Sequence, residues 1–391
     1  MKILLLIRSL NAGGTEKQLI YLARGLKDLG YEVHVAVFYQ DGTWDSLVKA
    51  NSKIHFHCLE KRGRWDVLSF IWSFKKLIQV YDFDVVYGFL PSGNLIASLA
   101  KRFYSSKRPK VAWGIRVSKM DYGRYGLLDI LLEWTERCLA PGADRIIVNS
   151  QKGLDICRNS GFPADKLFYI ANGIDTETYV KTKADGLRIR TMLGIPAEAS
   201  LIGIVARIDP MKDHETFLRA AALLAKRKKN AKFICIGGQT QRFPGYFEKL
   251  QRLASKLKIA DQIYWAGHQQ DIVSWINALD FSCSASSFGE GFSNAVGEVM
   301  ACEIPCVVTD VGDSAVIVGD AGRVVPPGEP RALADALLEL SSLSPDEKCL
   351  LGLRARSRIV EHFSIGRMVN DTDAALRGLH YDSTMLSPVG G

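Results

Sequence analysis

The chain has 391 residues, enough for two domains of ordinary size, and its 47% hydrophobic and 24% charged residues are typical of a soluble globular protein. No segment approaches the ~18 consecutive apolar residues of a membrane-spanning helix, so none is expected. The net charge of +8 arises within residues 1–175, which contain 25 Lys and Arg against 17 Asp and Glu, because residues 176–391 contain 25 of each. This asymmetry predicts an anionic partner for the N-terminal half: nucleic acid, a phospholipid surface or a diphosphate-bearing substrate.

The N-terminal half alternates short apolar runs with amphipathic segments, a pattern that predicts βαβ units and a parallel sheet. The first run, Ile3–Ile7, leads into a helix that is expected to end at Gly30. Gly13 and Gly14 lie in the turn between them, where the backbone can approach a phosphate, although such a pair is as often an ordinary turn. Further strands are expected at Val33–Phe38, Ile54–Cys58, Val85–Tyr87, Val111–Trp113, Ile146–Val148 and Leu167–Ile170.

A turn at Asn172–Asp175 and the polar stretch that follows it mark the expected domain boundary. A second alternating series follows, and the chain from about Arg331 to Leu379 is predicted to be helical. The strands of this second series are expected at Leu201–Ala206, Lys232–Ile236, Gln262–Trp265, Phe281–Ser284, Cys306–Val308 and Arg323–Val325.

Two cations follow the first strand of the second series. Arg207 ends that strand, and Lys212 lies in the next loop, where Asp213 is placed to cap a helix. An arginine and a lysine at the carboxyl end of a strand can together hold a diphosphate. Salt bridges of these cations to Asp209 and Asp213 explain the pattern about equally well.

Two carboxylates follow the strand that ends near Ser284. Glu290 lies between two glycines, and Glu298 falls on the second turn of a helix that is expected to begin near Ser293 or Asn294. Ligands of open α/β sheets bind outside the carboxyl ends of the strands, where the backbone N–H groups of Gly291, Phe292 and Ser293 also lie. The alternative is an N-capped core helix with two solvated glutamates.

The segment from Glu290 to Glu298, Glu-Gly-Phe-Ser-Asn-Ala-Val-Gly-Glu, resembles the Glu-x7-Glu signature of the retaining glycosyltransferases of family 4. The segment around Arg207 and Lys212, Val-Ala-Arg-Ile-Asp-Pro-Met-Lys-Asp-His, is similar to the Arg and Lys pair of the same family. The resemblance implies the GT-B fold, in which two doubly wound, Rossmann-like domains face each other across a cleft. The domains are then 1–175 for the acceptor, 176–363 for the nucleotide sugar, and 364–391 as a helix crossing back to the first domain plus a tail.

The resemblance also assigns roles to individual residues. Arg207 and Lys212 would neutralise the departing nucleoside diphosphate, and Glu290 would contact hydroxyls of the donor sugar, helped by the N–H groups of residues 291–293. Glu298 would accept hydrogen bonds from the ribose. The remaining implied donor contacts are Gly13 and Gly14 at the diphosphate, Gly237 and Gly238 near the nucleotide, and the main chain of His268 at the base.

The chain departs from the family at one position. Many members have a histidine after the strand equivalent to Val111–Trp113, whereas this chain has Arg116 there, as in one branch of the family, and no histidine between His57 and His214. An arginine cannot act as a base, because its pKa exceeds ~12. Arg116 is therefore expected to bind a phosphate or carboxylate of a substrate.

Asp82-Phe-Asp84 matches the Asp-x-Asp metal motif of the other large glycosyltransferase fold. The pair precedes the expected strand Val85–Tyr87, whereas metal ligands should follow a strand and face the site. A solvated strand entry is the expected role, and no metal or other cofactor is expected.

The resemblance implies a retaining, metal-independent transfer of a hexose or N-acetylhexosamine from a nucleoside diphosphate sugar, with UDP as the expected nucleotide. The expected acceptor is a lipid-linked or surface-polysaccharide glycan such as lipopolysaccharide, and no nucleic acid is expected. Alternatives on the same fold are a soluble sugar-phosphate synthase, a nucleotide-sugar epimerase and a non-catalytic, membrane-associated protein that binds nucleotide sugar. A nicotinamide oxidoreductase is disfavoured, because no Gly-x-Gly-x-x-Gly follows the first strand.

Residues 64–78 form an amphipathic segment rich in Trp and Phe, and Lys61 and Arg62 precede it. Such a helix either covers the sheet or lies on an anionic membrane surface. The eight cysteines are scattered and several fall within apolar runs, which favours reduced core residues over a disulfide framework or a zinc site. The expected location is cytoplasmic, or peripheral on the inner face of the plasma membrane.

Overall fold

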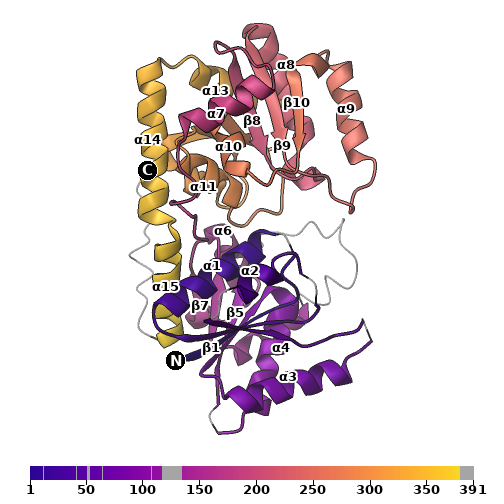
Figure 1. The fold of residues 1–391 in the computed structure, drawn as a ribbon, viewed down its shortest axis with the longest axis vertical. Helices are drawn as coiled ribbons and strands as arrows, with labels where there is room; N and C mark the ends of the chain where they lie inside the picture. The colour runs from indigo at the N-terminus through magenta and orange to yellow at the C-terminus, as the bar shows by residue number, and fades with distance from the viewer. Residues whose placement is uncertain are drawn as a thin grey trace. The chain divides into compact units, whose positions relative to one another are not determined.

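The computed structural model describes the chain except for residues 12, 41, 51–52, 64, 107, 117–133 and 379–391. The described residues form two compact units (Figure 1). The first contains Met1–Gly173 and the helix that begins at Ile365, and the second contains Ile174–Ser364. Over the described residues, no helix combines the length and apolarity needed to cross a membrane.

The first unit contains a seven-stranded parallel sheet with the order β3-β2-β1-β4-β5-β6-β7. β2 and β3 lie on one side of β1, and β4 to β7 follow on its other side, so the strand order reverses between β1 and β4. The strands are β1 Lys2–Ile7, β2 Glu32–Val37, β3 Ile54–Cys58, β4 Val85–Phe89, β5 Lys110–Ile115, β6 Arg145–Val148 and β7 Leu167–Tyr169.

Helices cover both faces of this sheet, which explains why β1 is a continuous apolar run with no polar alternation. Ile3 and Leu5 pack on the side of α1 and α15, and Leu4 and Leu6 pack on the opposite side with α3. Figure 1 shows α1 and α15 side by side. The helices are α1 Gly14–Asp28, α2 Asp45–Lys49, α3 Leu68–Tyr81, α4 Leu90–Phe103, α6 Gln151–Asn159 and α15 Ile365–Arg377, with 3-10 turns η2 Ala140–Gly142 and η3 Ala164–Lys166.

The second unit contains a six-stranded parallel sheet with the order β10-β9-β8-β11-β12-β13, which reverses between β8 and β11. Its strands are β8 Ser200–Val205, β9 Ala231–Ile236, β10 Ile263–Gly267, β11 Phe281–Ser284, β12 Cys306–Thr309 and β13 Gly322–Val325. Its helices are α7 Lys183–Met192, α8 His214–Arg227, α9 Tyr246–Lys256, α10 Ile272–Asn277, α11 Asn294–Ala301, α12 Ser314–Val318, α13 Pro330–Ser341 and α14 Pro345–His362, with 3-10 turns η4 Pro210–Lys212, η5 Ala260–Gln262 and η6 Gly319–Ala321.

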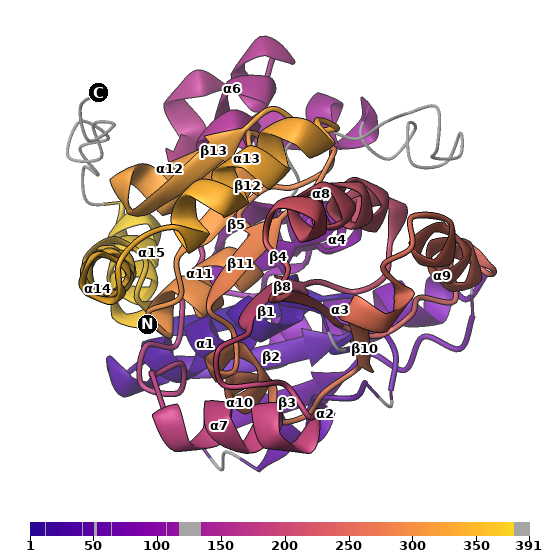
Figure 2. The same cartoon turned by 90° about the horizontal axis from the view of Figure 1, so that it is seen from above.

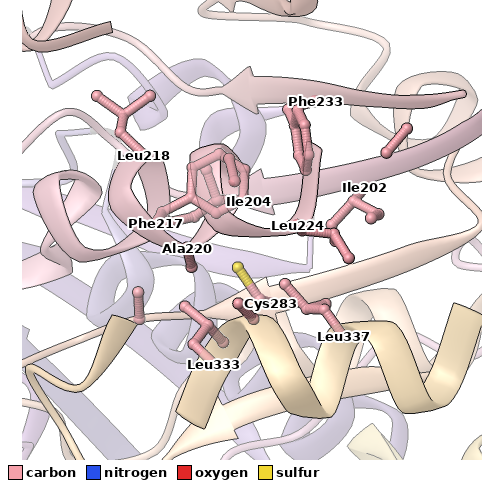
Figure 3. Close-up of a cluster of buried hydrophobic side chains, with 14 of the residues drawn as sticks. Ile202, Ile204, Phe217, Leu218, Ala220, Leu224, Phe233, Cys283, Leu333 and Leu337 are labelled. Atoms are coloured by element: carbon pink, nitrogen blue, oxygen red, sulfur yellow. The ribbon is translucent and has the colours of Figure 1, made fainter. Parts of the chain in front are cut away.

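A hydrophobic cluster fixes α8 and α13 to the second sheet. Phe217 and Leu224 of α8 pack with Ile204 of β8 and with Leu333 and Leu337 of α13 (Figure 3). The two helices also lie side by side when the molecule is seen from above (Figure 2). Because α8 is anchored in this way, its N-terminus has a fixed position beside the end of β8.

The architecture confirms the predicted fold class: two α/β units, each with a doubly wound parallel sheet. Every strand expected from an apolar run is present, with boundaries that differ by at most two residues. The predicted cap is also present, because the Asp213 carboxylate accepts a hydrogen bond of 3.1 Å from the backbone N–H of Thr216 in α8.

Candidate active site

The carboxyl ends of β8 and β11 lie next to each other in the second sheet, at the point where the strand order reverses. Arg207 lies two residues after β8, and Lys212 is the last residue of η4. Glu290 lies in the loop between β11 and α11. The fold therefore brings together three residues that the sequence marked, at the place where open α/β sheets bind ligands.

Aspartates flank the two cations but act mainly on the backbone. Asp209 accepts a hydrogen bond of 3.0 Å from the N–H of Met211 and caps η4, and Asp213 caps α8. Asp209 also pairs with Arg207 at 3.3 Å, but the Arg207 side chain is 60% exposed, so this ion pair is weak and leaves the guanidinium accessible. The alternative pairing of Lys212 with Asp213 is wrong, since Lys212 forms its ion pair with Glu290.

The Lys212–Glu290 ion pair is buried, with 17% of the Lys212 side chain and 7% of the Glu290 side chain exposed. The Ser286 hydroxyl donates a further hydrogen bond of 2.7 Å to the same carboxylate. Burial alone would raise the pKa of Glu290, but the charge and hydrogen bond of Lys212, the Ser286 hydroxyl and the charge of Arg207 together lower it. Glu290 is therefore an ionised hydrogen-bond acceptor at neutral pH, which contradicts the alternative of a solvated glutamate.

Close backbone packing fixes the loop that carries Glu290. Gly289 has a φ of +75°, and Gly312, with a φ of +57°, lies against the loop so that a Cβ atom there would be 2.5 Å from the carbonyl oxygens of Glu290 and Gly291. The N–H of Ser287 also donates a 2.9 Å hydrogen bond to the carbonyl of Met211 in η4. The loop and η4 are thus joined, which holds Glu290 beside Lys212.

The loop leads directly into α11, whose N-cap is Ser293, as predicted, although its side chain makes no capping hydrogen bond. Within the described part of the chain, the backbone N–H groups of Gly291, Phe292 and Ser293 have no hydrogen-bond acceptor. Glu298 is half-buried on the second turn of α11. Unpaired N–H groups at the start of a helix are suited to hydroxyl-rich or anionic ligands.

Gly237 and Gly238 follow β9 and lie beside the backbone that leads to Arg207. Gly237 has a φ of +153°, and a Cβ atom there would collide with the carbonyl oxygen of Ala206, so this position requires glycine. Gly238 lies against His268, which is exposed beyond β10. This packing joins the loops that follow β8, β9 and β10, and the predicted contact of the two glycines with the nucleotide stays a prediction.

In the first unit, Gly13 and Gly14 lie at the carboxyl end of β1, as expected. Gly13 is the N-cap of α1 in an extended conformation, and no side chain caps this helix. Gly14, the first helical residue, is exposed. The N-terminus of α1 therefore lies where the family would bind the donor diphosphate, but the Glu16 carboxylate lies against Gly13, so the diphosphate contact stays a prediction.

Arg116 follows β5 in the first unit and is half-buried. Its guanidinium donates hydrogen bonds of 2.9 Å to the Asn172 side-chain oxygen and 3.1 Å to the Tyr87 hydroxyl, and it lies 5.1 Å from the centre of the Phe89 ring. Its Nε is buried without a hydrogen-bond partner among the described residues. No carboxylate in the described ranges pairs with Arg116, so its positive charge is held in place by neutral groups and can receive an anion.

Asp82 and Asp84 lie at the amino end of β4, where Asp84 accepts a 2.7 Å hydrogen bond from the backbone of Lys2 and Asp82 ends α3. Both are therefore away from the carboxyl edge of the sheet, in agreement with the expected role at a strand entry.

The sequence did not single out Ser286, Asn172 and Tyr87 as site residues. Ser286 was one of several small polar residues after β11, and only the fold shows that its hydroxyl meets Glu290. Asn172 and Tyr87 orient Arg116 from distant parts of the chain. The sequence offered only one weak signal for them: Tyr87 is the single Tyr in an apolar strand, and Asn172 is the single Asn in the turn that follows β7.

Comparison with known proteins agrees with the fold. The model of glycosyltransferase family 4 matches residues 12–178, and the model of glycosyl transferases group 1 matches residues 199–342. These two matches together cover most of both units. The two family models and the fold identify a glycosyltransferase of the GT-B class, and the chain belongs to glycosyltransferase family 4.

Three related proteins illustrate the range of the family. The chain is 26% identical over 79% of its length to a Campylobacter jejuni N-acetylgalactosamine-N,N'-diacetylbacillosaminyl-diphospho-undecaprenol 4-alpha-N-acetylgalactosaminyltransferase, of which it covers 80%. It is 30% identical over 60% of its length to a D-inositol 3-phosphate glycosyltransferase of Saccharomonospora viridis, but it spans only 54% of that protein. The crystal structure of Anabaena Alr3699/HepE in complex with UDP has a TM-score of 0.83 at 20% identity, over 97% of this chain and 100% of that one.

Proposed function

We propose that this glycosyltransferase moves a hexose or an N-acetylhexosamine from a UDP-sugar to a lipid-linked or surface-polysaccharide acceptor, with retention at the anomeric carbon and without a metal ion. The observation that carries the proposal is the cluster of Arg207, Lys212 and the ionised Glu290 where β8 and β11 end. The same fold in Alr3699/HepE has been solved with UDP and with UDP-glucose, which supports the choice of donor.

The chemistry follows from the charges of these groups. Negative charge develops on the diphosphate as the glycosidic bond breaks, and an exposed Arg207 and a fixed Lys212 stabilise that charge without a metal. Glu290 accepts hydrogen bonds from sugar hydroxyls and positions the ring. The departing phosphate takes the proton of the acceptor hydroxyl on the same face of the sugar, which retains the configuration.

Arg116 is the proposed contact for a phosphate of the acceptor. Its guanidinium is fixed by Asn172 and Tyr87 and faces no carboxylate among the described residues. The Campylobacter relative acts on a diphospho-undecaprenol glycan by name, and the inositol relative acts on a phosphorylated inositol. An acceptor that carries a phosphate or diphosphate fits this position.

The outward face of α3 supports a membrane-bound acceptor. Phe70 and Phe74 of this helix pack on the sheet, whereas Leu68 and Trp72 of the helix are 87% and 64% exposed and Trp65, just before the helix, is 89% exposed. Lys75 and Lys76 are exposed beside them on the same helix. Exposed tryptophan interleaved with lysine is typical of a helix that lies at a membrane interface, so we place the enzyme on the inner, anionic face of the plasma membrane.

The test is to incubate the purified protein with UDP-sugars and an undecaprenyl-diphosphate-linked acceptor glycan, and to measure UDP release and glycan extension. The anomeric configuration of the product is then read by NMR. Release of UDP with extension of the glycan and an unchanged anomeric configuration is expected. Inversion, or no extension with any UDP-sugar, would contradict the proposal.

A soluble sugar-phosphate synthase is the second candidate. The observation that favours it is that Arg116 is held by Asn172 and Tyr87, neutral groups that leave its charge for an acceptor phosphate. The two candidates differ in their acceptor. Efficient glycosylation of a water-soluble sugar phosphate, with no extension of lipid-linked glycan, would select the synthase. Tight UDP-sugar binding with neither transfer nor donor hydrolysis would instead indicate a non-catalytic binding protein.

A further inference from the structure

Three of the seven histidines of the chain lie together on β2 and β3, at one edge of the first sheet. They are separate from the candidate site residues of this unit, Gly13, Gly14 and Arg116. His34 of β2 is directly opposite His55 of β3, and His57 follows two residues later on the same face. The ring centres of His34 and His55 are 4.4 Å apart, and those of His34 and His57 are 5.1 Å apart. Glu32, two residues before His34, completes the cluster.

We propose that Glu32, His34 and His55 form a binding site for a divalent transition-metal ion, with Zn²⁺ as the natural occupant. One ligand atom from each residue lies within 4.8 Å of the other two. His34 Nε2 is already 3.0 Å from Glu32 Oε1. Two imidazole nitrogens with one carboxylate oxygen form the ligand set of an open zinc site, in which water takes the fourth position.

The exposure of the Glu32 and His55 side chains leaves room for the remaining contraction of the site. Ligands at ~2.0–2.2 Å from one ion lie closer together than 4.8 Å, so Glu32 and His55 must move inward. Both are exposed and can rotate, whereas His34 is fully buried and fixed by the edges of Tyr81 and Phe83, at ring-centre distances of 4.6 Å and 4.9 Å. His34 is therefore a fixed ligand, and Glu32 and His55 can move toward an ion bound to it.

His57 provides the supporting hydrogen bond that metal-binding histidines usually have. His34 Nδ1 is 2.8 Å from His57 Nε2. Without an ion, His34 donates from Nε2 to Glu32 and accepts at Nδ1 from His57. With an ion on His34 Nε2, both rings change tautomer, and His34 Nδ1–H donates to His57.

The position of the cluster indicates a structural ion and not a catalytic one. Glu32 and His34 lie at the amino end of β2, opposite the edge where Gly13 and Arg116 lie. In the absence of an ion, Lys2 contacts Glu32 Oε1 at 3.3 Å, so that the ion would replace this exposed ion pair. The bound ion would tie the edge strand β3 to β2.

The test uses the full chain without a polyhistidine tag, stripped with EDTA and then freed of the chelator. Titration calorimetry with ZnCl₂ should give one ion per chain, and Zn²⁺ should raise the Tm. His55→Ala removes an exposed ligand and should weaken binding at least ~10-fold, with the Tm shift lost. Glu32→Gln should weaken binding as well, and His362→Ala, which removes a histidine beside a glutamate in the second unit, should change neither quantity.

A Co²⁺ titration gives an independent reading, because visible absorption bands of high intensity report tetrahedral coordination and should be absent in His55→Ala. Equal Zn²⁺ affinity in the wild type and in His55→Ala would overturn the proposal, as would the absence of Zn²⁺ binding by the wild type. Glycosyl transfer should be the same with and without Zn²⁺, and transfer that needs the ion would overturn its assignment as structural.

Discussion

Arg207 and Lys212 carry the same charge, but the fold holds them differently. The Arg207 side chain is 60% exposed, whereas Lys212 is half-buried and forms an ion pair with the buried Glu290. Replacing Arg207 therefore removes a contact to a ligand and little else. Replacing Lys212 also leaves a buried carboxylate without its cation, which raises the pKa of Glu290 and destabilises the second unit.

We expect Arg207→Ala to lower kcat/KM by an amount that corresponds to a loss of ~2–4 kcal/mol in transition-state stabilisation. The Tm of this variant should be unchanged. Lys212→Ala should lose a similar amount of activity and also lower the Tm. Lys229→Ala, which removes an exposed cation from the same unit, is the control and should change neither. Steady-state UDP release and thermal unfolding measure the two effects, and near-wild-type turnover in both folded variants would refute the assignment.

His214 begins α8 and is fully buried, and its ring lies beside the backbone of Ala206. Burial, assisted by the charge of Lys212, lowers its pKa to about 4. Above pH 6.5 the ring is neutral in the folded and unfolded states and adds no pH dependence. Below pH 6.5 the unfolded chain binds a proton that the folded chain takes up only near pH 4, so stability falls as the pH is lowered.

The shift of the His214 pKa from 6.5 to about 4 corresponds to a loss of about 3 kcal/mol in the free energy of unfolding between pH 6.5 and pH 4. His214→Phe removes this titration, so its free energy of unfolding should fall less over this range than that of the wild type. Chemical denaturation at several pH values measures the difference, with His362→Phe, at a partly exposed histidine, as control. Identical pH profiles for the wild type and His214→Phe would contradict the prediction.

At the scale of the elements, α3 covers the sheet with one face, as one interpretation of its sequence predicted, whereas membrane contact by its other face stays a prediction. Phe70, Phe74 and Ile78 cover the sheet, while Trp65, Leu68 and Trp72 remain in contact with solvent. The sequence pattern alone could not separate a sheet-covering helix from an interfacial one, because apolar residues occur on both sides. The exposed side chains make membrane contact testable at this helix.

We expect the protein to sediment with anionic liposomes at low salt and to be released as salt rises, since each basic residue near the surface contributes ~1 kcal/mol. Charge reversal at Arg62, Lys75 and Lys76, and at Arg64, which lies outside the described residues, should reduce sedimentation and leave UDP-sugar binding intact. Trp72→Ser should act in the same direction. Full activity on a water-soluble acceptor, with no liposome association at any salt, would favour the sugar-phosphate synthase.

The sequence predicted the elements better than their contacts. The strand Ile54–Cys58 was predicted with its observed bounds although it contains two histidines, because its ends are marked by turns and its interior keeps a strand period. The strand order was not readable residue by residue, since β4 lies beside β1 across 77 intervening residues. The contact of Lys212 with Glu290 joins positions 78 apart in the sequence, and only the paired strands β8 and β11 bring them together.

The histidine cluster on β2 and β3 is a second case in which contacts could not be predicted from the sequence. His34, His55 and His57 carry no metal-ligand spacing in the sequence, and their proximity depends on the register of β2 with β3. The cysteines, in contrast, agree in part with the interpretation as reduced core residues, because five of them are buried whereas Cys138 and Cys349 are exposed. All eight are free thiols, and burial raises the pKa of Cys235, Cys283 and Cys306, which fits inert core residues.

At the scale of the whole molecule, the distribution of charge separates two tasks. The excess of Lys and Arg is confined to residues 1–175, whereas the proposed donor site lies in the second unit, where the charges balance. The second unit supplies the positive charge for the departing diphosphate from Arg207 and Lys212. A metal ion is therefore not required for charge neutralisation in the proposed mechanism, and the Asp82 and Asp84 pair lies at the wrong end of β4 to hold one.

Glycosyl transfer should consequently persist when EDTA is present throughout the assay, at a rate within about twofold of the untreated enzyme, far less than the tenfold change that ~1.4 kcal/mol produces. If the histidine cluster holds Zn²⁺, the same treatment should lower the Tm, so stability and turnover would respond separately to the chelator. The measurement is UDP release and Tm in EDTA, and again after addition of Mn²⁺, Mg²⁺ or Zn²⁺. Loss of transfer in EDTA with rescue by Mn²⁺ would show that a metal takes part in the reaction, and the charge-neutralising role of Arg207 and Lys212 would then have to be reassigned.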